Sequence, residues 1–326
     1  MCYGYDGETA LRRSLETQGA SRRGILRTAV AGAAGAAAIG ALGAPAEAAG
    51  TRGSGNGRDR EVPERRISIQ LYTLRDATLP AGTAEKPWSI GWEAVLERLA
   101  QYGYPRVERA GLYGVTAATM KAKLDSLGIW ASSSHEGISD TSAAMYQKFD
   151  DANTFEQRYV VVPYLNSDKL SDWQRWAEQM NNEAYAAKRR GLRYGYHNHA
   201  HEFTVDLGGG RTPWDVLTKE LDPRLVHLEV DLYWVYTAGV NLGVADPLKF
   251  TKSVIRKAPQ TVRQFHVKDR AASNGDMADL GTGVIDFSSI FRKHTVEEYI
   301  VENDTPDVSP LTSAAVGKLY LEHLKY

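Results

Sequence analysis

The sequence predicts an α/β protein built as a single (β/α)8 TIM barrel. Short apolar, strand-like segments alternate eight times with longer stretches of helical periodicity, and glycine often stands where a helix should end. Such alternation is typical of a parallel sheet, and eight repeats allow the sheet to close into a barrel. An open, doubly wound sheet is the competing fold. No G-x-G-x-x-G pattern follows the first strand, which argues against its nucleotide-binding form.

The expected strands and helices follow one another in strict alternation. The strands are expected at 67–72, 106–110, 129–134, 159–163, 192–197, 226–231, 262–267 and 298–302. The helices are expected at 92–102, 116–127, 142–155, 171–190, 213–220, 247–257, 287–293 and 309–323. Gly103 and Gly128 stop two of these helices, whereas Pro213 and Pro247 begin two others at the first turn, where proline is tolerated.

The first part of the chain reads as a targeting segment rather than as part of a packed domain. The arginine pair 22–23 forms a twin-arginine signature, the stretch 29–44 is apolar and rich in Ala and Gly, and 46–48 is an A-x-A cleavage site. We therefore expect a signal peptide over 1–48, export by the Tat translocase and a secreted or extracytoplasmic protein. The apolar stretch is short for a membrane span, so no stable membrane association is expected after processing. An Ala-rich core helix is the alternative.

The composition fits an exported protein that binds a small molecule. The only cysteine, Cys2, precedes the arginine pair, so the mature chain would have no disulfide and would depend on a large core. Removal of residues 1–48 leaves 34 basic and 36 acidic residues, a balance that favours neither nucleic acid nor an anionic membrane as partner. A flexible linker over 49–65 and one barrel domain over 66–326 complete the expected organisation.

Four side chains that can bind a metal end consecutive strands in the second half of the chain. His197, Asp231, His266 and Glu302 each stand at the C-terminal edge of an expected strand. Because those edges converge on one mouth of a parallel barrel, the four side chains should meet there. Two imidazoles and two carboxylates suit one divalent ion such as Mn, Co, Zn or Mg. Each residue alone could be a solvated or structural group, but together they predict a metal site.

Other polar side chains near the same strand ends are candidates for catalysis. Three histidines and a carboxylate lie within 197–202, and period-two geometry places His197 and His199 on one face. The strand-five ligand is therefore open between His197, His199 and Glu202, with a polar surface loop as the alternative. Lys268 follows the strand-seven histidine on the same face and is a further candidate for proton transfer.

Substrate-binding candidates come from other strands and from one aromatic pair. Glu108 and His135, near the ends of strands two and three, are expected to bind hydroxyl groups at the mouth. Trp234, with Tyr233, could form an aromatic wall against a sugar face, although core packing is the simpler explanation for both rings. The segment 280–286 reads as a turn whose glycines are too few to claim a phosphate site.

Several short segments together resemble those of a known family. They are 69–75, 196–199 with 202–203, 231–234, 266–269, 280–283 and 302–303. They are similar to the xylose-isomerase-like barrels, the sugar phosphate isomerases and epimerases, and the resemblance covers nearly all of 66–326. It implies the barrel fold and a carbohydrate substrate without specifying the sugar.

The resemblance also implies a metal held by Glu, Asp, His and Glu from strands five to eight. Asp231, His266 and Glu302 match the last three by position, whereas strand five offers His197 in place of glutamate. In the typical epimerase two glutamates act as opposed acid and base, so the departure leaves the partner of Glu302 open. The groups that could take that place are His199, Glu202, Glu136 and Lys268.

The expected function is that of a divalent-metal-dependent isomerase or epimerase acting on a free carbohydrate outside the cytoplasm. The ion would supply stabilisation of the enediolate formed when a base removes the proton beside a carbonyl. A 3-keto-glycoside lyase is the first alternative, because β-elimination needs one metal, one base and one acid. A non-catalytic sugar-binding barrel is the second. An endonuclease of the abasic-site type fits neither the charge balance nor export.

Overall fold

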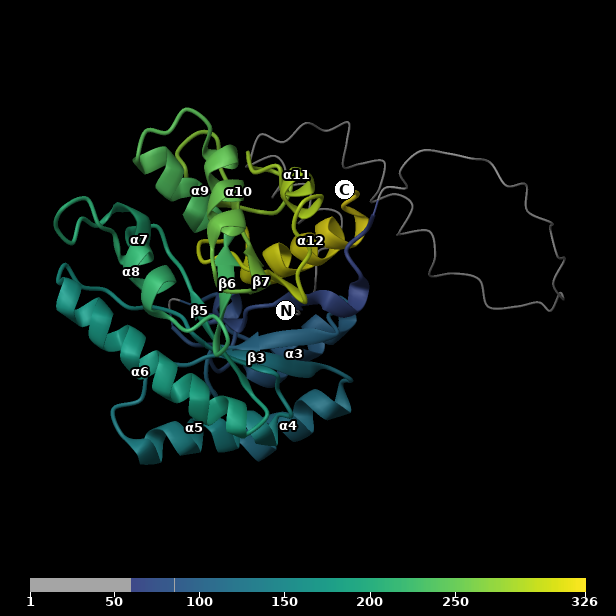
Figure 1. Cartoon of the computed structure of the whole chain (residues 1–326). Coiled ribbons are helices and arrows are strands. Elements are labelled where there is room, and N and C mark those ends of the chain that lie inside the picture. The colour runs from purple at the N-terminus through teal and green to yellow at the C-terminus, as the bar shows by residue number, and fades with distance from the viewer. Residues whose placement is uncertain (1–59, 85) are drawn as a thin grey trace, which may run out of the picture.

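The computed structural model describes residues 60–84 and 86–326 (Figure 1). The expected signal peptide, 1–48, and the part of the expected linker before Arg60 lie outside the described residues. Among the described residues, no helix combines the length and the apolar character needed to cross a membrane.

Eight parallel strands form one sheet that curls into a barrel, with helices around its outside (Figure 1). Their bounds are β1 (Ile67–Ile69), β2 (Arg106–Arg109), β3 (Trp130–His135), β4 (Tyr159–Val162), β5 (Arg193–His197), β6 (Val226–Asp231), β7 (Val262–Val267) and β10 (Glu298–Val301). The hydrogen-bonded order is β1-β10-β7-β6-β5-β4-β3-β2, and a parallel bridge between Gln70 and Glu108 joins β1 to β2. The predicted (β/α)8 barrel is confirmed, and the open sheet is excluded.

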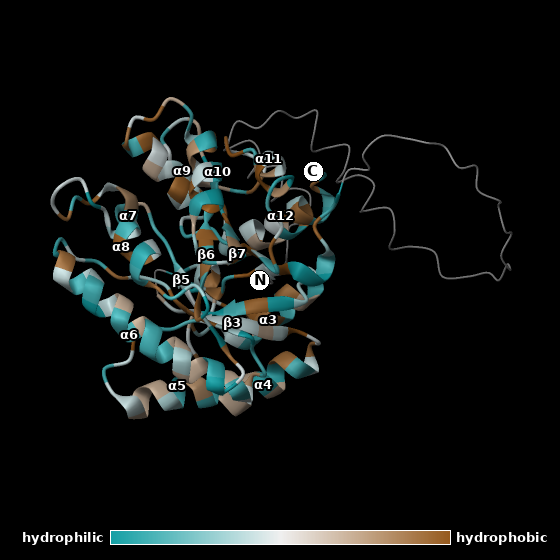
Figure 2. Cartoon of the chain, in the orientation of Figure 1, coloured by the Kyte–Doolittle hydropathy of each residue, from teal (hydrophilic) through white to brown (hydrophobic). Residues whose placement is uncertain are grey.

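Most of the helices that cover the strands begin at a side-chain cap; α3 and α6 do not. Their bounds are α3 (Trp92–Gln101), α4 (Ala117–Ser126), α5 (Ser142–Thr154), α6 (Leu170–Arg189), α8 (Pro213–Glu220), α10 (Pro247–Lys257), α11 (Phe287–Phe291) and α12 (Pro310–His323). Thr212 and Asp215 form a reciprocal capping box at α8, and Asp246 and Ser309 cap the two helices that also begin with proline. Figure 2 shows brown, hydrophobic segments in β6 and β7 and long hydrophilic stretches along α6.

Several short elements at the C-terminal ends of strands depart from the sequence-based expectation. They are the 3-10 helix η2 (Leu71–Leu74), α7 (His201–Thr204), α9 (Leu232–Asn241) and the hairpin of β8 (Asp269–Arg270) with β9 (Met277–Ala278). The first strand is shorter than expected because the Gln70 side chain accepts from the Tyr72 N–H at 3.0 Å and turns the chain into η2. Helix α9 follows β6 directly, since Asp231 accepts from the Trp234 N–H at 2.9 Å.

The interior of the barrel is polar, whereas branched apolar side chains fill most barrels of this kind. His227 Nε2 donates to Gln264 Oε1 at 3.0 Å, and Gln264 Nε2 donates to Glu298 Oε2 at 3.3 Å. Ser132 donates to the other carboxylate oxygen of Glu298. Gly195 leaves room for the histidine, because a Cβ at that position would lie 2.5 Å from His227 Nε2. Hydrogen bonding thus replaces apolar packing near the barrel axis.

The two ends of the described chain meet at the face of the barrel where the strands begin. Arg60 and Tyr326 exchange backbone hydrogen bonds of 2.7 and 2.9 Å, and Glu61 forms an antiparallel bridge with Lys325. Val62, within the segment 49–65 expected as linker, is buried and packs in the core. These contacts lie where β1 begins, on the face opposite the C-terminal ends of the strands.

The buried carboxyl of Glu298 makes stability depend on pH. Burial raises the pKa of Glu298 to about 7, so the folded chain binds this proton where the unfolded chain has released it. Stability therefore falls as the pH rises through that window and is constant above it. Between about pH 5 and about pH 8, wild type should lose up to about 3 kcal/mol more unfolding free energy than Glu298→Gln.

Denaturant unfolding at several pH values measures this difference. Glu297→Gln is the neighbouring control. Burial opposes ionisation of Glu297, but its bonds to Tyr159, Arg263 and Arg193 lower its pKa to about 2, below the window tested. Parallel stability curves for wild type and Glu298→Gln would contradict the role given to Glu298.

Candidate metal centre at the barrel mouth

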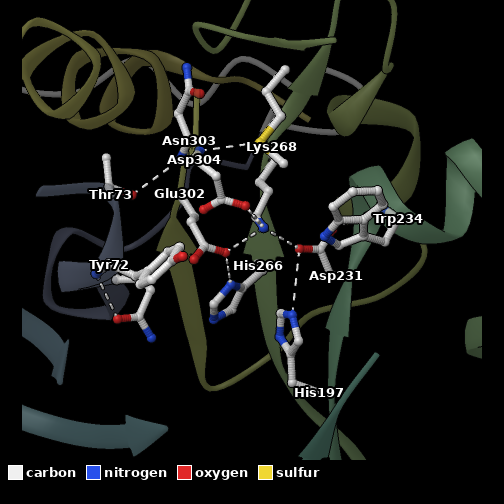
Figure 3. A network of polar contacts seen from close by, with 12 residues as sticks. Tyr72, Thr73, His197, Asp231, Trp234, His266, Lys268, Glu302, Asn303 and Asp304 are labelled. Atoms are coloured by element: carbon white, nitrogen blue, oxygen red, sulfur yellow. Dashed lines mark hydrogen bonds and ion pairs between the residues drawn. The ribbon is translucent and has the colours of Figure 1, made fainter. Parts of the chain in front are cut away.

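Four side chains from four neighbouring strands converge at the mouth of the barrel. His197 ends β5, Asp231 ends β6, His266 lies one residue before the end of β7, and Glu302 follows β10 directly. All four are buried, and one ligand atom from each lies within 4.8 Å of the others. Figure 3 shows the four side chains directed toward a shared space. The structure thus brings together the residues that the sequence predicted as ligands.

The donor set suits a divalent ion. Burial lowers the pKa of His197 to about 3, so this imidazole is neutral near neutral pH and retains a lone pair. Asp231 Oδ2 is buried with Lys268 Nζ at 3.1 Å and His197 Nε2 at 3.8 Å, and burial raises the pKa of its carboxyl to about 6. A bound cation would add to the positive charge of Lys268 in offsetting the cost of burying these carboxylates. Two imidazole nitrogens and two carboxylate oxygens could therefore hold one metal ion.

Two deeper carboxylates, Glu108 and Glu229, bind the other nitrogens of the two histidines. Glu229 Oε1 lies 3.1 Å from His197 Nδ1 and 3.0 Å from His266 Nε2, while Glu108 Oε2 lies 2.7 Å from His266 Nε2. The remaining nitrogens face the mouth, His197 Nε2 at 3.8 Å from Asp231 Oδ2 and His266 Nδ1 at 2.6 Å from Glu302 Oε2. Such acceptors orient a ligating histidine and fix its tautomer. Glu108 and Glu229 therefore direct both outer nitrogens toward the mouth.

The structure places Glu108 and His135 inside this network rather than free to bind hydroxyl groups. Glu108 accepts from Ser133 Oγ at 2.6 Å and from Gln70 Nε2 at 2.8 Å. His135 Nε2 lies 2.8 Å from Glu229 Oε1. These contacts occupy both residues and give them a supporting place behind the ligands. A second group with metal-binding spacing, which overlaps the first, comprises His135, His197, Glu229 and His266.

Lys268 lies beside the cluster as a buried cation. Its Nζ is 2.7 Å from Glu302 Oε2, 3.0 Å from Asp304 Oδ2 and 3.1 Å from Asp231 Oδ2 (Figure 3). Burial would lower the pKa of Lys268, but the three carboxylates raise it well above its ordinary value and keep the ammonium charged. Burial likewise opposes ionisation of Glu302, yet Lys268 and His266 hold its pKa well below the usual range. The protonated Lys268 and the ionised Glu302 thus form a buried ion pair.

Glu202 belongs to the turn that follows β5 rather than to the cluster. The Tyr196 hydroxyl donates to Glu202 Oε1 at 2.7 Å, and the His199 backbone N–H donates to Oε2 at 2.8 Å. His201 Nδ1 lies 3.5 Å from the same Oε2. The carboxylate therefore holds the turn that carries His199, and protein groups occupy both of its oxygens.

Aromatic rings and His199 form the rim of the site. His199 Nδ1 and Trp234 Nε1 are both buried without a hydrogen-bond partner, and their rings lie 5.4 Å apart. The ring of Tyr164 lies 5.2 Å from that of His199. Figure 3 shows Tyr72 and Trp234 on opposite sides of the carboxylates. Tyr233, in contrast, packs in the core and donates to a backbone carbonyl at 2.9 Å, so it does not extend the wall.

Glu229 and Asp304 are two residues of the site that were not predicted from the sequence. Glu229 lies on the same face of β6 as Asp231, so the alternation of that strand was a signal for a second, deeper carboxylate. Asp304 lies beyond the last residue of β10, where period-two reasoning no longer applies. Its position beside Lys268 depends on how the following loop turns back over the barrel.

The fold and the site together define a (β/α)8 barrel with a cluster at its mouth that could bind a metal. The chain belongs to the family of xylose isomerase-like TIM barrels, whose model matches residues 96–295. This is a family of sugar-processing enzymes.

Named relatives of the chain include a dehydratase and epimerases. Inosose dehydratase of Geobacillus kaustophilus (strain HTA426) is 25% identical over 273 residues, which cover 71% of this chain and 87% of the relative. A sugar phosphate isomerase/epimerase structure from Parabacteroides distasonis ATCC 8503 has a TM-score of 0.60 at 22% identity, covering 80% of this chain and 94% of its own. The structure of L-ribulose 3-epimerase has a TM-score of 0.53 at 15% identity, covering 78% and 94%. At these identities the two structures support the fold alone.

Replacement of His197 tests which histidine would bind a metal ion. His197→Ala removes a nitrogen that faces Asp231 and should weaken metal binding at least about tenfold, the size of effect seen when even supporting groups of a metal site are lost. His199→Ala is the matched control and should retain the metal. Elemental analysis after dialysis, with metal titration by calorimetry, measures both variants. Full occupancy in His197→Ala would transfer the ligand role to His199.

Proposed function

We propose that this protein is a divalent-metal-dependent isomerase or epimerase that acts on a carbohydrate. The observation that carries the proposal is the convergence of two imidazoles and two carboxylates at the mouth of a barrel from a sugar-processing family. The twin-arginine signature supports an exported enzyme whose substrate is a free sugar.

The groups that would hold the ion are His197 Nε2, Asp231, His266 Nδ1 and Glu302. When bound, a divalent cation supplies polarisation of a carbonyl oxygen and stabilises the negative charge that develops there. Mn, Co, Zn and Mg are all compatible with a mixture of imidazole and carboxylate ligands. Because the ligands must be deprotonated to bind a cation, metal affinity should decrease as the pH falls.

Proton transfer falls to Glu302, itself one of the proposed ligands, and to the groups beside the cluster. Glu302 is charged and can remove a proton from the carbon next to a substrate carbonyl. Lys268 Nζ, 2.7 Å from Glu302 Oε2, can stabilise the developing charge or return a proton. His199 has an unpartnered Nδ1 at the rim, and burial lowers the pKa of its imidazole, so it is neutral and suited to hydrogen bonding with a substrate hydroxyl rather than to taking a proton. Return of the proton to the neighbouring carbon isomerises the sugar, and return to the opposite face epimerises it.

The rim supplies a place for the sugar ring. Trp234 and Tyr72 flank the carboxylates from opposite sides (Figure 3), and Tyr72 is 46% exposed. Aromatic faces of this kind pack against the C–H surface of a ring while leaving its hydroxyl groups free for polar contacts. The two rings would hold the substrate above Lys268 and Glu302.

Elimination is the second candidate, and the position of Glu202 favours it. An epimerase with two opposed glutamates needs a second free carboxylate on strand five, but both Glu202 oxygens are bonded to Tyr196 and His199. β-Elimination requires one base to take the proton and one acid to protonate the departing oxygen, which Glu302 and Lys268 could supply. The name of one relative, inosose dehydratase, also describes an elimination.

Glu302→Gln tests the proposed base. The substitution keeps the size of the side chain but removes its basicity, so kcat should fall at least about 100-fold. Far-UV circular dichroism should remain that of the folded barrel. Glu297 lies just before the first residue of β10, at the end of the strand away from the cluster. Glu297→Gln should therefore keep kcat within about twofold of wild type. Retained turnover in Glu302→Gln would assign the base to another group.

The fate of the proton tests the reaction itself. In heavy water, turnover of the metal-loaded enzyme should place deuterium on the carbon beside the carbonyl, detectable by mass spectrometry of the sugar. With a 3-keto-disaccharide, release of a free sugar would indicate elimination, whereas an intact chain length would indicate isomerisation or epimerisation. Treatment with a chelator should abolish exchange. Sugar binding that persists unchanged without metal, and without exchange, would indicate a binding protein instead.

A further inference from the structure

A groove of about 320 Å³ lies next to the metal centre, between the first strand-helix connection and the segment that follows β10. The lining residues that matter for recognition are Thr73, Arg75, Asp76, Trp88, Asp304 and Thr305. Its volume is within the range of pockets that bind small ligands. None of the groups assigned above to the metal or to proton transfer lines it.

The groove and the metal centre share a wall. Asp304 lines the groove, and its Oδ2 lies 3.0 Å from Lys268 Nζ, which contacts Glu302 at 2.7 Å. Thr73 Oγ1, on the groove side, accepts from the Asn303 backbone N–H at 3.1 Å. Figure 3 shows Thr73 and Asp304 beside Glu302. A ligand that fills the groove would therefore extend from the position where the reacting sugar is proposed to lie.

The lining has the chemistry of a carbohydrate subsite. Trp88 is 41% exposed and lines the groove, so part of its ring is open to a ligand there. Arg75 is held in place, because its Nη2 donates to the Asp304 carbonyl at 2.7 Å and its Nη1 to the Tyr72 carbonyl at 3.1 Å. An aromatic face beside fixed donors and carboxylate acceptors matches a ring with an apolar face and hydroxyl groups at its edge.

The charges in the groove favour a neutral ring over a phosphate. Arg75 is accompanied by two carboxylates, Asp76 and Asp304, which are paired with Lys86 at 2.9 Å and Lys268 at 3.0 Å. A dianion there would meet one guanidinium and two carboxylates, and both lysines that could help to bind it are already paired with those carboxylates. Recognition of phosphate commonly relies on several converging donors without competing carboxylates. The groove therefore suits an uncharged sugar unit.

We propose that this groove is a second sugar subsite, so that the enzyme takes a glycoside of at least two sugar units rather than a monosaccharide. The inference rests on the proposed function, since it places the reacting unit at the metal centre. Trp88 stacks on the second ring, and Arg75 and Asp76 bind its hydroxyl groups. The glycosidic bond would then lie beside Asp304, between the groove and the metal centre.

Calorimetric titration of the metal-loaded full chain with glucose, cellobiose and maltose tests the subsite. At least one disaccharide should bind about tenfold or more tightly than glucose, and Trp88→Ala should reduce this ratio to near one. Trp88→Phe should restore part of the ratio, because it keeps an aromatic face. Tyr185→Ala removes another exposed aromatic ring, on α6, and should leave the ratio unchanged.

Each other outcome has a distinct meaning. Binding of glucose with no gain from a second ring, or a ratio unaffected by Trp88→Ala, would overturn the subsite while leaving the proposed function in place. Tighter binding of glucose 6-phosphate than of either disaccharide, weakened by Arg75→Gln, would overturn the choice of a neutral ring. Absence of binding by every sugar would overturn the proposed function together with the subsite.

Discussion

Buried negative charge is the constraint on which this barrel depends. Glu108, Glu229, Asp231 and Glu302 all lie inside the barrel with essentially no exposure, where an unpaired carboxylate would be costly. Their partners are three histidines and Lys268, all at hydrogen-bond or ion-pair distance. Removing one partner would leave the others with unbalanced charge. The network therefore limits which residues of the mouth can vary independently.

The charged groups form two levels along the barrel axis. At the deeper level, Glu108 and Glu229 bind the inner nitrogens of His197 and His266. At the outer level, the other nitrogens of the same histidines meet Asp231 and Glu302. Because each imidazole connects the two levels, the deeper carboxylates set the orientation of the groups that would contact a metal. Chemistry at the mouth is thus linked to hydrogen bonds one level below it.

The sequence was sufficient for the fold and for the outer level of the site. Alternating strands and helices with caps and glycine stops predict the barrel, and strand ends necessarily converge. His197, Asp231, His266 and Glu302 could be named because each stands at such an end. The direction in which Glu202 and His135 face depends on neighbours distant in the chain, so period-two reasoning could not decide it. Helix α9 was missed because Asp231 ends one element and caps the next.

The sequence also could not show what the loops do. Asp304 and Trp88 come close to the site only through turns that no local periodicity describes. The groove is made by residues near both ends of the barrel domain, brought together where the last strand pairs with the first. Pairing of the last strand with the first therefore creates a groove that could not be predicted from either segment alone.

The pairing of Arg60 with Tyr326 has a consequence for how the molecule sits in its surroundings. Both residues lie on the face where β1 begins, away from the side that carries the cluster. An anchor, a support or a fused partner attached at either residue would therefore lie on the face opposite the cluster. The mouth that carries the cluster would then face away from the attachment point and stay accessible to small molecules in solution.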